Sequence, residues 1–360
     1  MAYIGAEVMI SPLGETTEEN WLALCENRSG ISLVPDAGFD KEGLYLSKIP
    51  GLTGPARFRG LLTRALKQIS EKIDPAILPS ARTIVLISST KGELDGNIAD
   101  QFGEPAAALI TEFHLAHQPI IVSNACISGV LAINAAANFI NAKIYDHVIV
   151  IGCDLISDFV VYGFQSLFAI SDQPCMPFDA ARKGISMGEG CAAVVVSSDR
   201  EIYKDQPLRL FSGASANDAN HISGPSRTGE GLVRSTKKTM NNNGITASEI
   251  DFICAHGTAT LYNDEMESIA FDRLNLTHIP LNSLKGYFGH TLGAAGVIET
   301  SVCMQMIRQG MLLKSLGFRE KGTSKELNIV SANKPAQINT ILKTASGFGG
   351  GNAALIIRKI

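Results

Sequence analysis

One cysteine and two histidines in this 360-residue chain each follow a predicted β-strand, where a side chain is well placed to react. The cysteine is Cys126, which comes after the apolar run at 120–122 and before a small-residue helix pattern at 127–142 that no proline interrupts. A sulfur at a helix N-terminus meets unpaired N–H groups and the positive end of the helix dipole, which favour thiolate over thiol. This stretch predicts either a nucleophile or a buried structural cysteine.

His256 and His290 hold comparable places in the second half of the chain, after predicted strands at 251–255 and 279–283. Because strand ends in open α/β sheets meet where sites form, we expect these residues to converge on Cys126. Two imidazoles beside a thiolate suit acyl transfer, since they stabilise a carbonyl oxygen that becomes negative. A Cys/His₂ metal site is the alternative, but no carboxylate or fourth ligand stands at metal-site spacing, so we predict no metal.

Weak internal similarity predicts a duplicated α/β unit. A strand, a reactive residue and a small-residue helix occur in this order around Cys126, and again around His290 with a helix that begins at 293. The polar segment at 198–207 has the composition of a surface linker. We therefore predict an N-terminal half over 1–200, which carries the cysteine, and a C-terminal half over 207–360, which carries both histidines.

Bulk composition excludes several classes of function. The net charge is −4 and no run of five Lys and Arg residues occurs, so a nucleic-acid partner has no electrostatic support. The seven cysteines lack CxxC spacing, which favours reduced thiols and a cytoplasmic protein. No segment reaches the ~18 uncharged apolar residues of a membrane span, and residues 1–10 are expected to form a strand rather than a signal peptide.

Four short motifs stand in order along the chain. They are N-A-C-I-S-G at 124–129, H-G-T-A-T at 256–260, K-G-Y-F-G-H at 285–290 continuing into G-A-A-G-V-I-E at 293–299, and G-F-G-G at 347–350. Together they resemble the motifs of β-ketoacyl-[acyl carrier protein] synthases, the elongating Cys-His-His condensing enzymes of the thiolase superfamily. The resemblance covers nearly the whole chain. It implies an α/β, thiolase-like fold with duplicated βαβαβαββ halves in a layered α-β-α-β-α arrangement.

The resemblance also implies a decarboxylative Claisen condensation. Cys126 would take an acyl chain from a carrier-protein thioester, and His256 and His290 would hydrogen-bond the thioester carbonyl of malonyl-acyl carrier protein. Loss of carbon dioxide gives an enolate that attacks the Cys126 thioester, in fatty acid synthesis or in specialised polyketide or polyene synthesis. The substrates are carried on the phosphopantetheine arm of the carrier protein, so no free cofactor is expected.

Further site residues follow from the same resemblance. Lys285 matches the family's active-site lysine, and Glu299 and Asp264 match the positions of its carboxylate partners. Phe348 is expected to gate the acyl pocket with its ring and to form an oxyanion hole with its backbone N–H together with that of Cys126. Two threonines match those that hydrogen-bond the phosphopantetheine arm, namely Thr258 and Thr260.

Single residues separate the chain from relatives with other activities. Thiolases place a second cysteine in the C-terminal glycine-rich loop, and 347–352 has none. Initiating synthases that accept acyl-CoA have asparagine at the position of His290, and chain-length-factor subunits replace the nucleophile at Cys126. The resemblance therefore favours the elongating synthases.

The chain is shorter than ordinary elongating synthases, and the missing residues are expected between 92 and 121, where the family shapes its acyl pocket and dimer contact. The predicted partners are acyl carrier protein and a second ketosynthase-like chain, in a homodimer or heterodimer formed through the strand before Cys126. One alternative is a non-catalytic, chain-length-factor-like subunit of a heterodimeric ketosynthase. Another is an acyltransferase or thioesterase that uses Cys126 without decarboxylation.

Overall fold

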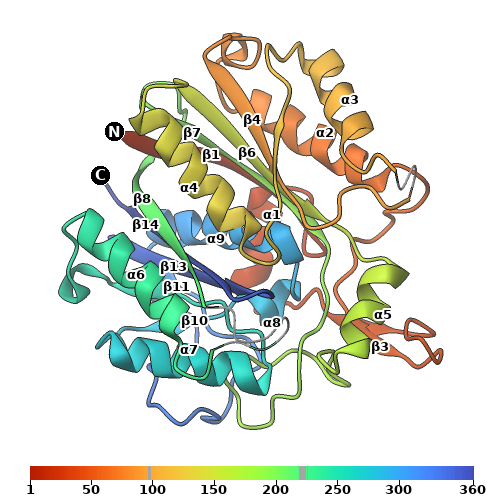
Figure 1. Ribbon diagram of the computed structural model, residues 1–360, viewed down its shortest axis with the longest axis vertical. Coiled ribbons are helices and arrows are strands. Elements are labelled where there is room, and N and C mark those ends of the chain that lie inside the picture. Colours follow the sequence, from red (N-terminus) through yellow and green to blue (C-terminus); the bar gives the residue numbers. More distant parts are fainter. Residues whose placement is uncertain (96–98, 219–223, 225) are drawn as a thin grey trace.

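A computed structural model describes residues 1–95, 99–218, 224 and 226–360 of the chain (Figure 1). Within this part, ten strands form one mixed sheet in the order β10-β9-β13-β14-β8-β1-β7-β6-β4-β5. The first half of the chain supplies β1 (Ala2–Ile10), β4 (Thr83–Ser88), β5 (Ile120–Val122), β6 (His147–Asp154) and β7 (Gly190–Ser197). The second half supplies β8 (Leu208–Asn217), β9 (Phe252–Cys254), β10 (Leu281–Asn282), β13 (Thr340–Gly347) and β14 (Gly351–Arg358).

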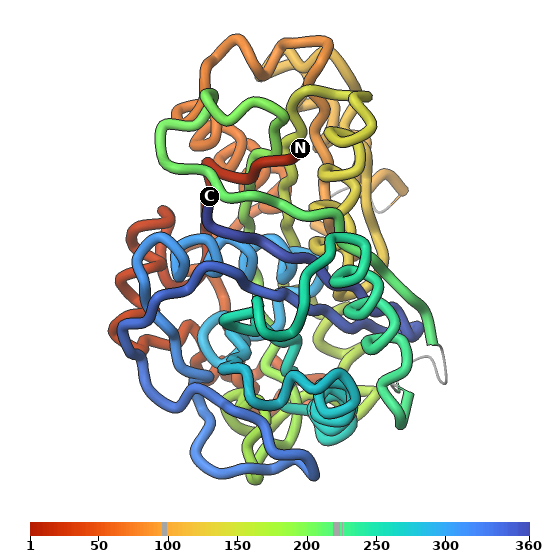
Figure 2. Tube along the Cα trace, turned by 90° about the vertical axis from the view of Figure 1, so that its left-hand side faces the viewer, coloured from red at the N-terminus to blue at the C-terminus, as the bar shows by residue number. Residues whose placement is uncertain are grey.

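The sheet order is symmetric about the junction of β1 and β8, which pair antiparallel. On each side of this junction the next two strands are antiparallel to their neighbours and the two outermost strands are parallel. The two chain ends lie near each other beside the junction (Figures 1 and 2). The predicted boundary at 198–207 falls between β7 and β8, and the division into 1–200 and 207–360 stays a prediction.

Helices form three layers around the two halves of the sheet. The central layer is α4 (Ser128–Asn141) and α9 (Ala295–Gln309), which both contact strands of both halves. Helices α2 (Arg57–Ser70) and α3 (Gly103–Phe113) cover the outer face of the first half. Helix α6 (Glu230–Asn242) covers the outer face of the second, with α7 (Leu261–Arg273) beside it. This arrangement is the predicted layered, thiolase-like fold.

Alternating side chains of the strands explain why both faces of the sheet are covered. In β4, Ile84 and Leu86 belong to the central core, while Val85 and Ile87 belong to the outer core under α2. Successive residues of a strand point to opposite faces, so a continuous apolar run is stable only between two layers. The β-branched run at 83–88 forms such a strand, β4, whose residues are all buried.

The two central helices approach closely through a pair of glycines. A Cβ built on Gly129 would lie 2.8 Å from Gly296 Cα, and one built on Gly296 would lie 2.4 Å from the backbone nitrogen of Val130. Only glycine leaves room for such a crossing. Because Gly129 follows Cys126 and Gly296 follows His290 by a few residues, this contact draws the two reactive positions together.

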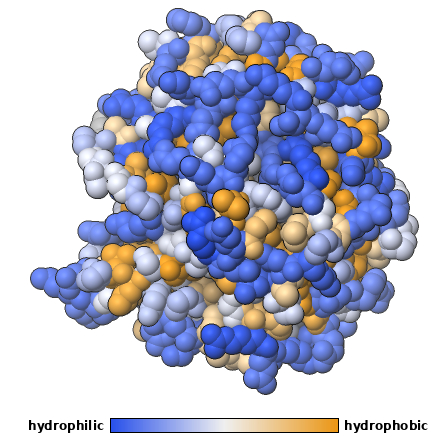
Figure 3. All heavy atoms as spheres, turned by 180° about the vertical axis from the view of Figure 1, so that it is seen from behind, coloured by the Kyte–Doolittle hydropathy of each residue, from blue (hydrophilic) through white to orange (hydrophobic). Residues whose placement is uncertain are grey.

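The remaining elements are short or lie at the periphery. They comprise α1 (Thr17–Cys25), α5 (Asp158–Ser166), α8 (Lys285–Phe288), the hairpin of β2 (Ser32–Val34) and β3 (Leu44–Leu46), the pair β11 (Met311–Leu312) and β12 (Lys334–Pro335), and three 3₁₀ turns at Pro75–Ile77, Ala247–Glu249 and Leu292–Ala294. No helix in the described residues is long and apolar enough to cross a membrane. Figure 3 shows a mostly hydrophilic face with small, separate apolar patches.

Candidate active site

Cys126 lies in the turn between β5 and α4, as the strand-turn-helix pattern predicts. The turn is closed by Ser128, whose hydroxyl donates to the carbonyl of Ala125 at 2.6 Å and accepts from the N–H of Asn124 at 2.7 Å. Ala125 adopts a φ of 44°, a left-handed conformation that costs a non-glycine residue energy. This strained turn holds the Cys126 side chain 5% exposed, at the floor of a cavity.

The expectation that the helix N-terminus makes Cys126 a resting thiolate is wrong. Burial raises the pKa of the Cys126 thiol to about 11, although Lys285 and the backbone N–H groups of Phe348 and of Cys126 itself lower it. The free energy needed to remove a thiolate from water exceeds the stabilisation that these few donors provide. The resting group is therefore a thiol, and its activation must accompany the reaction.

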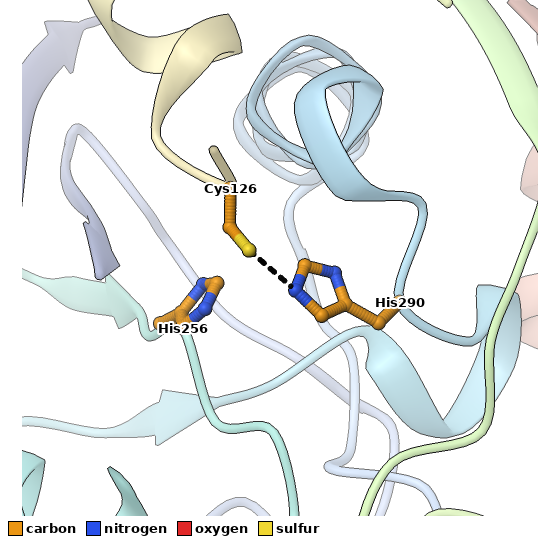
Figure 4. A group of neighbouring side chains, drawn as sticks. All are labelled: Cys126, His256 and His290. Atoms are coloured by element: carbon orange, nitrogen blue, oxygen red, sulfur yellow. Dashed lines mark hydrogen bonds between the residues drawn. The ribbon is translucent and has the colours of Figure 1, made fainter. Parts of the chain in front are cut away.

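His290 is in direct contact with Cys126 (Figure 4). Its Nε2 lies 3.0 Å from the Cys126 sulfur, and its Nδ1 accepts the backbone N–H of Leu292 at 3.3 Å. An imidazole whose Nδ1 accepts a hydrogen bond carries its hydrogen on Nε2 when neutral. Burial, followed by Lys285 and Lys343, keeps the pKa of His290 well below its usual value, so the ring is neutral. His290 thus presents an Nε2–H donor to the sulfur.

His256 has the same polarity. Its Nδ1 lies 3.3 Å from Lys285 Nζ, and an ammonium group can only donate, so the hydrogen of the neutral ring is on Nε2. Burial, followed by Lys285, His290 and Lys343, keeps the pKa of His256 well below its usual value. The rings of His256 and His290 meet edge to face, with centroids 5.3 Å apart. The two histidines and Cys126, far apart in sequence, are brought together as predicted.

Lys285 is buried and has three acceptors for its three N–H bonds. These are the Nδ1 of His256, the His256 carbonyl at 2.6 Å, and Glu299 Oε1 at 2.8 Å. Burial alone would raise the pKa of Glu299, but Lys285 and Lys343 outweigh it and hold the pKa below its usual value. The ion pair between Lys285 and Glu299 thus fixes the tautomer of His256.

Asp264 does not join this ion pair, and its predicted pairing with Lys285 is wrong. It accepts the backbone N–H of Phe178 at 2.6 Å and of Thr258 at 2.9 Å, and it lies 3.9 Å from the guanidinium of Arg182. The reason is its place on the first turn of α7, which faces these loops. Asp264 shapes the loop beyond His256.

Two buried charged residues of the site had no predicted role. Glu267 accepts the backbone N–H of His256 at 2.8 Å and of Gly257 at 2.6 Å, and so holds the histidine loop. Its spacing of three residues from Asp264 on one helix was a usable signal, because such residues share a face. Lys343 on β13 forms an ion pair with Glu299 Oε2 at 2.7 Å. Nothing in the local sequence pattern marks this lysine as part of the site.

Two cavities meet at Cys126. One, of about 430 Å³, is lined by Cys126, both histidines, Phe348 and the predicted arm-binding residues Thr258 and Thr260. The other, of about 370 Å³, is lined mainly by apolar residues, among them Phe159, Val160 and Phe164 of α5. The Phe348 ring stacks on Phe164 with centroids 5.3 Å apart and lines both cavities. Phe348 and Phe164 therefore border both cavities.

The same three side chains have the ligand types of a Cys/His₂ metal site, and their ligand atoms all lie within 4.8 Å of one another. Metal-binding histidines donate their second ring N–H to a carboxylate or carbonyl. Here each Nδ1 instead accepts a hydrogen bond, from Lys285 or from Leu292. The polarity of the rings suits an anionic oxygen or sulfur and does not suit a cation.

Comparisons with known proteins agree with this geometry. Residues 103–201 match the family model described as "Beta-ketoacyl synthase, N-terminal domain", and residues 210–319 match "Beta-ketoacyl synthase, C-terminal domain". A similar protein is the "Putative 3-oxoacyl-[acyl-carrier-protein] synthase, mitochondrial" of Schizosaccharomyces pombe, 28% identical over 97% of each chain. That alignment is 417 residues long, so the yeast protein carries segments that this 360-residue chain lacks.

Two further proteins are similar to this chain. The 3-oxoacyl-[acyl-carrier-protein] synthase 2 of Rhizobium meliloti is 33% identical over 66% of this chain and 60% of its own length. Among solved structures, the ketosynthase ApeO, in complex with its chain length factor ApeC from Xenorhabdus doucetiae, superposes with a TM-score of 0.88 at 25% identity. That superposition covers 100% of this chain and 98% of the other, so the fold is shared throughout.

Proposed function

Because the chain belongs to the β-ketoacyl synthase family, we propose that it condenses a Cys126-bound acyl chain with malonyl-acyl carrier protein, with loss of carbon dioxide. The observation that carries the proposal is the polarity of the two buried histidines, which both turn an Nε2–H toward the space around the Cys126 sulfur. The product is a β-ketoacyl chain on the carrier protein, for fatty acid or specialised polyketide or polyene synthesis. No separate cofactor takes part.

In the first step, the Cys126 sulfur attacks the carbonyl carbon of an acyl thioester on the carrier protein. The oxygen becomes negative and accepts the backbone N–H groups of Cys126 and Phe348, which already point at the sulfur. The carbon–sulfur bond to the carrier breaks, and the departing thiolate takes the proton that Cys126 gives up. A thiol with a raised pKa suits this exchange, since the proton stays in place until the leaving group can accept it.

In the second step, malonyl-carrier protein loses carbon dioxide. The electron pair of the broken C–C bond forms an enolate, whose oxygen accepts the Nε2–H groups of His256 and His290. One such donor in a buried site is worth about 3 kcal/mol of barrier. The enolate carbon then attacks the Cys126 thioester, and the released Cys126 thiolate takes a proton from water. Both rings remain neutral throughout, so they act as donors and not as proton shuttles.

We assign a different one of the two cavities that Phe348 lines to each substrate. We assign the cavity with Thr258 and Thr260 to the phosphopantetheine arm, because these hydroxyls lie 2.9 Å apart and line the route to Cys126. The other cavity, which Phe159 and Val160 of α5 help to line, is assigned to the acyl chain, because its lining is largely apolar. Movement of the Phe348 ring would join them when the two substrates react.

The expected partners are acyl carrier protein and a second ketosynthase-like chain. Strand β5 is the last strand of the sheet, and Ile120 on it is 40% exposed, so its outer edge is open to pairing. The similar ApeO protein was solved with a chain length factor, which supports a heterodimer. A non-catalytic role is not better supported, because Cys126 and both histidines are present. Seven unpaired cysteines support a reducing compartment such as the cytoplasm.

The experiment is product analysis with malonyl-carrier protein labelled in its free carboxyl group and acyl primers of several lengths. We expect labelled carbon dioxide and a β-ketoacyl product two carbons longer than the primer. Hydrolysis or transfer of the primer without carbon dioxide would establish the acyltransferase or thioesterase alternative. Failure to acylate Cys126, with and without a co-expressed ketosynthase partner, would establish the non-catalytic subunit.

A further inference from the structure

Lys285 fixes the tautomer of His256, but the second buried lysine, Lys343, has no role in the steps above. Lys343 is 0% exposed on β13, and its ammonium lies 2.7 Å from Glu299 Oε2. The other oxygen of Glu299, Oε1, lies 2.8 Å from the Lys285 ammonium. One buried carboxylate is therefore shared by two buried ammonium groups.

This sharing gives the cluster of Lys285, Lys343 and Glu299 a net charge of +1. Without Lys343 the other two charges would cancel. Lys343 also donates to the carbonyls of Thr344 at 2.5 Å and Cys254 at 3.5 Å, which together with the Glu299 ion pair surround its ammonium group. An uncompensated buried charge is costly, and a protein keeps one where an anion forms.

We propose that Lys343 is a positioning residue that acts through Glu299 to keep a net positive charge behind Cys126 and the two histidines. With Oε2 engaged by Lys343, Glu299 offers Lys285 a single oxygen, and two N–H bonds of Lys285 remain on His256. The positive charge favours the Cys126 thiolate over the thiol. Its benefit to the enolate rests on the proposed function.

Electrostatic effects at the site agree with this assignment. Burial lowers the pKa of both histidines, and both lysines lower it further, which keeps the rings neutral donors. Burial alone would lower the pKa of Lys343, but Glu299 together with Cys254 and Cys303 outweighs it and raises the pKa above its usual value, so the lysine stays charged. The other titratable groups that face this cluster and the site are Cys254, Cys303, Glu267, Asp264 and Asp154.

The test is the rate at which iodoacetamide alkylates Cys126 near pH 8, followed by mass spectrometry of the Cys126 peptide. Below the thiol pKa this rate follows the thiolate fraction, and it needs neither carrier protein nor acyl substrate. Lys343→Met removes one positive charge and is expected to slow alkylation on the order of tenfold. Lys343→Arg keeps the charge and is the matched control, expected to stay near the wild-type rate.

A double variant separates charge from structure. Lys343→Met combined with Glu299→Gln leaves Lys285 alone and restores the net charge of +1, so we expect most of the wild-type alkylation rate to return. The single variant Glu299→Gln raises the charge to +2 and is expected to alkylate faster than wild type. Thermal unfolding identifies the folded variants, and these last two carry the test if Lys343→Met does not fold.

The outcomes are distinguishable from those of the proposed function. A double variant no faster than Lys343→Met, or a folded Glu299→Gln no faster than wild type, would overturn the charge role and leave Lys343 a purely structural residue. The expected alkylation order together with an absence of condensation would uphold the role of Lys343 and overturn the proposed function alone.

Discussion

The two halves of the sheet have the same arrangement of strands but carry different reactive side chains. Outward from the β1–β8 junction, the strands of each half follow the same order and the same directions. In each half the outermost strand, β5 or β10, is followed by a turn and a buried small-residue helix, α4 or α9, and in the second half the short helix α8 lies between the strand and the turn. The turn carries Cys126 in the first half and His290 in the second, and their sulfur and Nε2 lie 3.0 Å apart. Equivalent positions of a duplicated scaffold thus supply a nucleophile and a donor.

The difference between the halves lies in the charges around these positions. The second half brings Lys285, Lys343 and Glu299 behind the histidines, all of them buried. From its own half Cys126 receives its own backbone N–H, and Phe348 of the second half adds another. Under the proposed function, the first half carries the acyl chain, while the second half stabilises negative charge. This division predicts that mutation can separate the two half-reactions.

Replacing Cys126 by alanine is expected to have the largest effect. Condensation falls on the order of 10³-fold or more, because no acyl-enzyme forms. Release of carbon dioxide from malonyl-carrier protein continues, because both histidines keep their donors. The measurement compares labelled carbon dioxide with β-ketoacyl product for the same sample. Loss of both activities in a folded variant would show that the halves are not separable.

Removing either histidine is expected to have the next largest effect, and the two variants should differ. His256→Ala and His290→Ala each lose one donor to the enolate, so decarboxylation falls about 10²- to 10³-fold. Acylation of Cys126 slows more in His290→Ala, because only that ring was found in contact with the sulfur among the described residues. Asparagine at either position, which keeps an N–H donor, is the control and should recover part of the rate. Equal acylation rates in the two alanine variants would contradict the assigned geometry.

A substitution at the contact between the halves, where Gly129 meets Gly296, is expected to lower stability. Alanine at Gly296 forces its Cβ against the backbone of α4, and we expect a loss of about 1–3 kcal/mol in the free energy of unfolding. Gly60→Ala is the matched control, because Gly60 also lies in a helix and a Cβ there meets nothing within 4 Å. That control should be neutral or stabilised by up to about 1 kcal/mol. Chemical denaturation of both variants gives the values, and a stability of Gly296→Ala equal to that of the control would rule out the tight crossing.

The smallest expected effect is on the pH dependence of stability, which can be tested at a buried carboxyl of each half. Burial raises the pKa of Asp154 to about 6 and that of Glu267 to about 7. In both cases the folded state holds the proton more tightly, so the stability each contributes is present in acid and is lost as the pH rises through the folded pKa. Between about pH 5 and about pH 8, the melting temperature of Glu267→Gln should fall less than that of wild type. The melting temperature of Asp154→Asn should also fall less steeply than that of wild type, but only below about pH 7. A drop in Glu267→Gln as large as that of wild type would contradict the raised pKa.

The local sequence pattern was sufficient to predict many of the strands and helices and the three residues at the centre of the site. The apolar run at 120–122 is β5, and the helix pattern at 127–142 is α4 within one residue, because the periodicity of apolar side chains reports which faces are covered. The order of the motifs also led to the three residues that meet at the site. The strand predicted at 279–283 is only Leu281–Asn282, because Pro280 has no N–H to donate to a strand ladder and the chain turns into the short helix α8 from Lys285.

Features that depend on distant partners were not predictable in this way. Lys343 interrupts an apolar strand, and its burial makes sense only with Glu299, which α9 brings from another part of the chain. The pKa of Cys126 depends on how completely other elements exclude water, and a helix N-terminus alone pointed in the wrong direction. Asp264 has the right residue type for a partner of Lys285 but faces Arg182 and two loop N–H groups instead.

The most direct test of the division between the halves follows the mass of the Cys126 peptide through one turnover. The account predicts that an acyl-carrier protein adds one acyl mass at Cys126, in wild type and in His256→Ala alike. Malonyl-carrier protein should then remove this mass rapidly from wild type, with release of a β-ketoacyl product, and about 10²-fold more slowly from His256→Ala. An acyl mass on another residue, or its removal from both proteins at the same rate, would contradict the account.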